Sequence, residues 1–153
     1  MPQFSKRQRV RHSAAEMFDL VADAEKYPEF VPLCDRLRIK SRTQKGASIT
    51  VLVADMTVAY KMIRQTFTSR VTLDRPNLKI LVEYVDGPFK HMQNRWAFHL
   101  VGEHACDIDF FIDYEFRSRT LGILMGTLFD TVFRRMASAF EQRADTVYGR
   151  RIA

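Results

Sequence analysis

The spacing of apolar residues changes once along this chain, and the change limits the fold more than any other feature. From Asp35 to Arg117, apolar and polar residues alternate, as they do in strands with one covered and one solvated face. After this stretch, apolar residues recur at steps of three and four, the period of an amphipathic helix. Because the apolar faces of sheet and helix must cover each other, this order predicts an α+β fold.

Turn residues divide the alternating stretch into about six strands of an antiparallel meander. The clearest strand runs from Cys106 to Phe116, where one face is apolar, the other carries carboxylates, and Phe111 is the single exception. The turns fall at Lys45-Gly46, at Arg75-Pro76-Asn77, at Asp86-Gly87-Pro88 and at Gly102-Glu103-His104.

Before the meander, the sequence predicts a strand up to Val10 and a short helix that starts with a capping box of Ser13 and Glu16. The apolar segment Tyr27 to Cys34 is expected to be a loop, because each of its prolines disfavours helix at the preceding residue. A long helix from about Thr120 to Tyr148 would span roughly 40 Å. The expected architecture is a curved antiparallel sheet of six to seven strands around this C-terminal helix, in a single domain over residues 1–153.

A curved sheet that wraps one helix touches it along a line and leaves space on either side. This space would be lined by apolar residues from the covered face of the strands, from the segment Tyr27 to Cys34 and from the helical stripe. We expect the cavity to be lined by Phe30, Val31, Leu33, Met56, Val58, Tyr60, Phe67, Val71, Val82, Tyr84, Phe89, Trp96, Phe98, Phe110, Ile112, Tyr114, Leu124, Leu128, Phe129, Val132, Phe133 and Met136.

Few polar side chains are expected inside this cavity. The hydroxyls of Tyr60, Tyr84, Tyr114 and Ser69 lie on the covered face and can hydrogen-bond either a ligand carbonyl or the backbone of an ordinary core.

Three segments are candidates for the mouth of the cavity, and each of them also fits simple packing. They are the loop Tyr27 to Leu33, the turn Gly87-Pro88-Phe89, and the helix start at Gly122 and Gly126.

The chain carries no recognisable catalytic motif. It has no Gly-rich phosphate loop, no metal-ligand spacing and no nucleophile motif, and its four histidines are not spaced as ligands. Cys34 and Cys106 fit buried structural residues better than nucleophiles. The carboxylates of Asp107, Asp109 and Asp113 lie opposite the apolar face and are expected in solvent. We expect no enzyme activity, no metal and no cofactor.

Composition bounds the class of protein. With 153 residues and 46% hydrophobic residues, the chain can form its own core, and two cysteines are too few for a disulfide framework. The absence of a long apolar run and of a signal core predicts a cytoplasmic protein. The formal charge of +6 fits an acidic partner such as nucleic acid, anionic lipid or an acidic protein, and it also fits an ordinary solvated surface.

Several motifs together resemble the coenzyme Q-binding START-domain family. They are the segment Tyr27-Pro28-Glu29-Phe30-Val31-Pro32-Leu33-Cys34, the run Phe67-Thr68-Ser69-Arg70-Val71, the turn Asp86-Gly87-Pro88-Phe89 with Asn94-Arg95-Trp96, and the helix positions Leu121-Gly122 and Phe129-Asp130. The resemblance covers essentially the whole chain. It implies a helix-grip (START-like) fold and an apolar cavity for ubiquinone or a related isoprenoid quinone, bound as a ligand. Within this family, the chain is more similar to a bacterial cytoplasmic member than to a mitochondrial one.

These observations leave three hypotheses. The leading one is non-enzymatic binding and chaperoning of a ubiquinone-like ligand in support of respiration or quinone biosynthesis, with transient docking on an anionic membrane surface at its inner face. The alternative, drawn from toxin relatives in the family and from the net charge, is association with the large ribosomal subunit. The third is a polyketide cyclase or dehydratase, which would need an acid or base inside the cavity.

Overall fold

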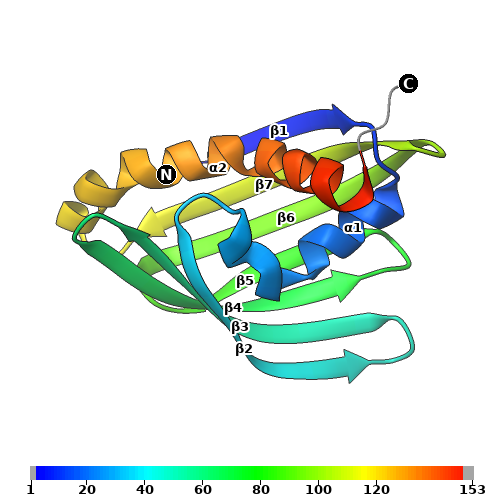
Figure 1. Ribbon diagram of the computed structural model, residues 1–153. Coiled ribbons are helices and arrows are strands. Elements are labelled where there is room, and N and C mark those ends of the chain that lie inside the picture. The colour runs from blue at the N-terminus through cyan, green and yellow to red at the C-terminus, as the bar shows by residue number, and fades with distance from the viewer. Residues whose placement is uncertain (1–2, 150–153) are drawn as a thin grey trace.

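One sheet and one long helix dominate the structure, a computed structural model that describes residues 3–149 (Figure 1). The seven strands are all antiparallel and follow the order β1-β7-β6-β5-β4-β3-β2. The helix-grip fold expected from the sequence is confirmed. The elements are β1 (Gln3–Val10), α1 (Ala14–Ala22), the 3-10 helix η1 (Ala24–Glu29), β2 (Cys34–Lys45), β3 (Ile49–Tyr60), β4 (Ile63–Asp74), β5 (Lys79–Asp86), β6 (Phe89–Gly102), β7 (Ala105–Phe116) and α2 (Arg119–Tyr148).

The sheet curves around α2, and helices α1 and α2 lie on the same face of it (Figure 1). Register shifts mark bulges or irregularities in the pairing of β2 with β3, of β4 with β5 and of β6 with β7. Bulges increase the local twist and bend a strand, which helps the sheet to close on the helix. The first strand pairs with β7 from Gln3 opposite Asp113 to Val10 opposite Cys106 and so extends the sheet beneath α2.

The segment that links α1 to β2 differs in part from the loop predicted over Tyr27 to Cys34, because only residues 30–33 lack regular secondary structure. The capping box is confirmed, because the Ser13 hydroxyl accepts from the Glu16 amide at 3.0 Å and the Glu16 carboxylate accepts from the Ser13 amide at 3.0 Å. Beyond α1, however, residues 24–29 form η1 with Pro28 inside it. Aromatic packing holds this short helix, because the Tyr27 ring lies 5.3 Å from the ring of Phe140 on α2 and the Tyr27 hydroxyl donates to the Val21 carbonyl.

Aromatic rings form the contact between α2 and the sheet. Phe129 packs edge-on against Phe89 and Phe116, and Phe140 lies 5.3 Å from Trp96. Each fully buried side chain of this kind contributes about 1.5–3 kcal/mol relative to an exposed one. In the first ten residues of α2, Met125 alone is buried, whereas buried residues recur at every turn from Phe129 to Ala144. The start of α2 is therefore held less firmly than the rest.

The turn at Gly87 requires glycine on two grounds. Its φ is +142°, and a Cβ there would lie 2.7 Å from Cβ and 2.9 Å from Cα of Phe67. We expect Gly87→Ala to lower the free energy of unfolding by more than about 2 kcal/mol, because Phe67 is packed in the core and cannot retreat. Urea denaturation measures the loss.

Gly46→Ala is the matched control, because Gly46 also has a positive φ of +75° but no atom lies within 4 Å of its added Cβ. Its loss should reflect the backbone alone, about 1 kcal/mol. Equal losses for the two variants would show that the approach of Phe67 does not constrain the turn.

Candidate ligand-binding site

A largely enclosed apolar cavity of about 90 Å³ lies between the sheet, α2 and η1. Its walls are almost entirely aliphatic and aromatic side chains from α1, η1, the strands β2 to β7 and the middle of α2. They are Val21, Ala22, Ala24, Tyr27, Leu37, Ala54, Met56, Phe67, Ser69, Val71, Ile80, Val82, Phe89, Met92, Asn94, Trp96, Ile112, Phe133, Met136 and Phe140. Ligand pockets commonly measure roughly 300–1,000 Å³, so this cavity is smaller than a typical ligand pocket.

A groove of about 500 Å³ lies at the end of the molecule where α2 begins. It is open to solvent and separates the first turns of α2 from the β3–β4 hairpin and the end of the η1–β2 loop. It is lined by Pro32, Leu33, Tyr60, Ile63, Leu124, Thr127, Leu128, Thr131, Val132 and Arg135.

One ridge of α2 joins the groove to the cavity. Leu128 and Val132 line the groove, whereas Met136 and Phe140 line the cavity, and the four residues follow one another at steps of four. Residues four apart lie above one another on the same face of a helix. A single apolar stripe therefore runs from the solvent-exposed groove into the closed interior.

Three polar side chains reach the cavity, and they differ in how well they are satisfied. The Asn94 amide donates to the Phe111 carbonyl at 2.8 Å and accepts from the Trp96 indole at 2.9 Å, and the Tyr27 hydroxyl donates to the Val21 carbonyl. Ser69 is buried, and its hydroxyl has no hydrogen-bond partner among residues 3–149. Ser69 is thus the cavity group best placed to bond a ligand oxygen.

The side chains predicted to line a cavity fall into three groups, and their role as ligand contacts stays a prediction. The enclosed cavity is lined by Met56, Phe67, Val71, Val82, Phe89, Trp96, Ile112, Phe133 and Met136. The groove is lined by Leu33, Tyr60, Leu124, Leu128 and Val132. Outside the cavity and the groove, the core holds Val31, Val58, Phe98, Phe110, Tyr114 and Phe129, and the partly buried Phe30 and Tyr84 pack against it.

Unlike Ser69, the three tyrosines predicted to face a ligand do not line the cavity. The Tyr84 hydroxyl accepts from the Phe89 amide at 3.1 Å and so fixes the β5–β6 turn. Tyr114 packs against Phe133 with ring centroids 5.2 Å apart, and burial raises the pKa of its hydroxyl. Tyr60 stands at the groove. Asn94 was missed, although it shares the two-residue period of Trp96 and Phe98 on the covered face.

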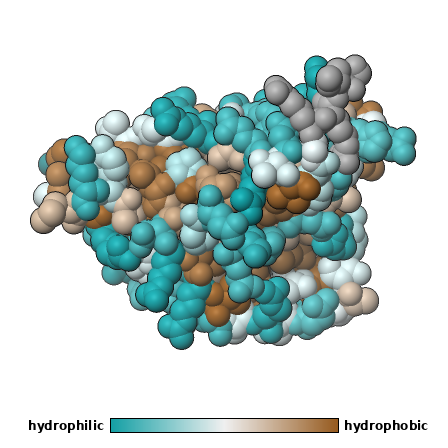
Figure 2. Space-filling view, in the orientation of Figure 1, coloured by the Kyte–Doolittle hydropathy of each residue, from teal (hydrophilic) through white to brown (hydrophobic). Residues whose placement is uncertain are grey.

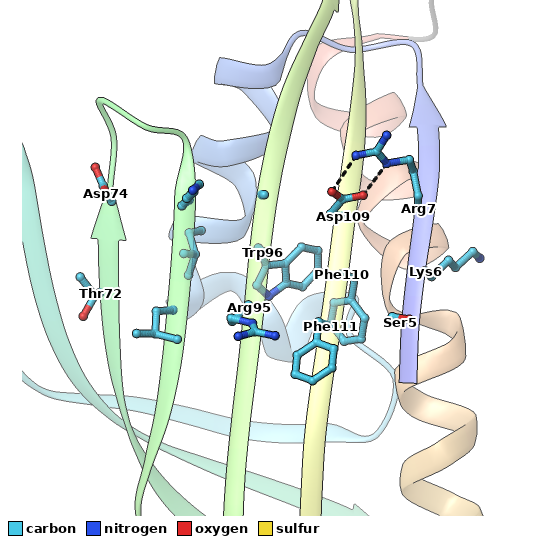
Figure 3. A pocket seen from close by; sticks show the side chains of 14 residues that line it. Ser5, Lys6, Arg7, Thr72, Asp74, Arg95, Trp96, Asp109, Phe110 and Phe111 are labelled. Carbon is cyan, nitrogen blue, oxygen red and sulfur yellow. Dashed lines mark hydrogen bonds and ion pairs between the residues drawn. The ribbon is translucent and has the colours of Figure 1, made fainter. Parts of the chain in front are cut away.

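A larger hollow, of about 700 Å³, lies on the opposite face of the sheet (Figure 3). Here Phe111, the exception in the alternation of β7, is covered by the Arg95 guanidinium at 4.3 Å from its ring. Arg7 bonds both carboxylate oxygens of Asp109 at 2.6 and 2.9 Å, which lowers the pKa of Asp109 to about 2. Asp109 and the Phe111 ring are already partnered, whereas Lys6 and Lys79 in the same lining form no ion pair within residues 3–149. With no enclosed apolar volume, this depression resembles an ordinary polar sheet surface.

The described lining of the cavity holds few titratable groups. Tyr27 is the one titratable residue in the described lining, and burial raises its pKa. Both cysteines are buried, and burial raises the pKa of Cys34 to about 11 and that of Cys106 to about 12, so neither thiol ionises readily.

Within residues 3–149, no group of three or more His, Cys, Asp or Glu side chains is arranged to hold a metal ion. No helix in this part of the chain combines the length and the apolar character needed to cross a bilayer.

The fold and the hollow interior define a helix-grip domain with an apolar cavity. The family model described as polyketide cyclase / dehydrase and lipid transport matches residues 10–141, and the chain belongs to this family.

Three similar proteins agree with this assignment. The chain is 37% identical over 153 residues to the ribosome association toxin RatA of Escherichia coli strain K12, covering 99% of this chain and 92% of that protein. It is 31% identical over 152 residues to the mitochondrial coenzyme Q-binding protein COQ10 homolog B of Xenopus laevis, covering 97% of this chain and 60% of that protein. A START superfamily protein from Mycobacterium smegmatis shares the fold at 21% identity, with a TM-score of 0.78, over 95% of this chain and 98% of that chain. The resemblance to the START-domain family is confirmed.

Proposed function

We propose that this protein binds a hydrophobic, quinone-like ligand between the sheet and α2 and does not catalyse a reaction on it. The observation that carries the proposal is the apolar ridge of α2, which leads from the open groove through Leu128 and Val132 to Met136 and Phe140 in the cavity. A ring with carbonyl oxygens would find the Ser69 hydroxyl inside, and an isoprenoid tail would lie along the ridge. The 31% identity to a protein named for coenzyme Q binding supports a quinone as the ligand.

Binding requires the cavity to open, because about 90 Å³ holds only a few waters. The start of α2 is the element best suited to move, since it buries few side chains and contains two glycines. A Cβ at Gly126 would meet no atom within 4 Å, and at Gly122 the nearest atom would be Phe116 Cβ at an ordinary 3.9 Å. Close packing therefore explains neither glycine. Displacing this part of the helix would join the groove to the cavity.

The energetics favour a carrier that recognises the headgroup. Against water, burying an isoprenoid tail yields up to ~0.8 kcal/mol per CH₂, or about 3–4 kcal/mol for each five-carbon unit. Against a bilayer this gain nearly vanishes, because the membrane already shelters the tail. Net affinity must then come from the ring and its hydrogen bonds.

The proposed function is binding without catalysis, because the described part of the cavity lining carries no free acid or base. A cyclase or dehydratase needs a group that moves protons beside its substrate. Among the described residues that line the cavity there is no Asp, Glu, His, Lys, Arg or Cys, and the one titratable hydroxyl, on Tyr27, is already bonded to Val21.

A second candidate function is association with the ribosome. The 37% identity to a ribosome association toxin favours it. So does the edge strand β2, where Arg36, Arg38 and Lys40 are exposed and form no ion pair within residues 3–149. Free cations spaced along an edge suit the phosphates of RNA, and they also prevent edge-to-edge pairing of sheets.

Filling the cavity should abolish quinone binding. Ala54 lines the cavity from β3, and we expect Ala54→Phe to weaken the binding of a short-chain ubiquinone at least about tenfold, because the new ring occupies the ligand's space. Trp96, the single tryptophan, lies in the cavity wall, so quenching of its fluorescence measures binding.

Ala97→Phe places the same ring on the outer face of β6 and should leave the affinity unchanged. Ser69→Ala should weaken quinone binding about two- to tenfold through one lost hydrogen bond. This variant replaces Ala54→Phe as the test if Ala54→Phe does not fold. Wild-type affinity in both cavity variants would refute binding at this site.

Stiffening the start of α2 should slow ligand entry. We expect Gly126→Ala to raise the free energy of unfolding by about 1 kcal/mol, since alanine favours helix and its methyl group meets open space. The rate of quinone binding, followed by stopped-flow fluorescence, should fall. Ser138→Ala, beyond the groove on the same helix, should leave the rate unchanged. A Gly126→Ala variant that is less stable, or that binds as fast as the wild type, would contradict a moving helix start.

The ribosome candidate is tested by co-sedimentation. If β2 binds ribosomal RNA, then replacing Arg36, Arg38 and Lys40 with alanine should reduce co-sedimentation with ribosomes, and added salt should reduce it in the wild type. Replacing Lys79 with alanine, on β5 at the outer sheet surface, is the control. No pelleting of the wild type with ribosomes at low salt would remove this candidate.

A further inference from the structure

Large apolar side chains are exposed at the end of the molecule where α2 begins. Met62, in the turn between β3 and β4, is 98% exposed, and Ile123 and Leu124 on α2 are 75% and 59% exposed. Leu124 and the partly exposed Tyr60 line the two sides of the same groove, which places the hairpin and the helix start next to each other. Figure 2 shows apolar surface at this end and along the seam between α2 and the segments beside it. Lone exposed apolar residues are ordinary, but a group gathered around a groove marks an interaction site.

The two segments that carry this patch bear charges of one sign. Residues 59–64 and 117–128, which carry the exposed apolar side chains, contain Lys61, Arg64, Arg117 and Arg119 and no Asp or Glu. Arg135 adds a fifth cation at the groove. Asp35 pairs with Arg64 at 2.5 Å and neutralises that one. The remaining cations flank aliphatic side chains, an arrangement that suits an anionic lipid surface.

We propose that this end of the protein docks on an anionic bilayer, with Met62, Ile123 and Leu124 inserted among the lipids and the cations at the headgroups. A second copy of the chain would bring the same cations face to face, which opposes self-association through the patch. RNA would match the cations but gains nothing from Met62, Ile123 and Leu124, which cannot stack on bases as aromatic rings do. Docking in this way would turn the groove toward the bilayer.

This inference goes beyond ligand binding, and its test contains no quinone. Flotation with vesicles of phosphatidylcholine containing about 30% phosphatidylglycerol should carry the protein, whereas pure phosphatidylcholine vesicles should carry far less, because the surface attraction is electrostatic. Met62→Ser and Ile123→Ser together should lower vesicle binding at least about tenfold. Both side chains are exposed, so circular dichroism should show an unchanged fold.

Leu100→Ser is the matched control, because Leu100 is 75% exposed, as Ile123 is, but lies at the opposite end beside the β6–β7 turn. It should bind vesicles like the wild type. Equal losses for Leu100→Ser and the double variant, or no preference for anionic vesicles, would overturn the proposal. The proposal would also be overturned if the wild type did not bind vesicles and the double variant instead lost ribosome pelleting or self-association. Quinone binding is measured separately by Trp96 fluorescence. It shows whether the protein still binds a ligand in the cavity if it does not bind vesicles.

Discussion

The contact between α2 and the curved sheet is the constraint on which the rest of the structure depends. Phe129 and Phe133 pack on Tyr114, and Phe140 packs on Trp96 and on Tyr27 from η1. These rings hold the helix in the concave face from Phe129 onward, while its first turns rest on little more than Met125 and Leu121. The cavity and the groove lie along the same helix, at its firmly and its loosely held parts. The firmly packed part of α2 can therefore line the cavity, while the weakly packed start of the same helix can move to open it.

Much of the fold could be predicted from the sequence, because burial on one side imposes a period that can be read residue by residue. The alternation of Cys106 to Phe116 and the stripe from Phe129 to Phe140 are direct consequences of one covered face. The helix η1 could not be predicted, since it depends on Tyr27 reaching Phe140, a contact between residues distant in sequence. Local proline chemistry indicated a loop there, and long-range packing overrode it.

The candidate site was harder to predict than the fold, for a geometric reason. The sequence indicates which side chains face inward, but the curvature of the sheet decides which of these meet a hollow and which interlock. Tyr114 and Phe67 both face inward, yet Tyr114 is packed among rings and Phe67 lines the cavity. Asn94 could have been found from the period of β6, where it stands as a polar residue among covered ones. The volume of the cavity depends on the position of α2, and no local sequence pattern predicts it.

The proposed function requires the space between the sheet and α2 to open for a ligand. A crystal structure of the protein grown with a short-chain ubiquinone tests it most directly. The predicted result is a quinone ring within hydrogen-bonding distance of Ser69, with the first turns of α2 displaced and the groove and cavity merged. A quinone lodged elsewhere, or a cavity still closed at about 90 Å³ under saturating ligand, would contradict the proposed function.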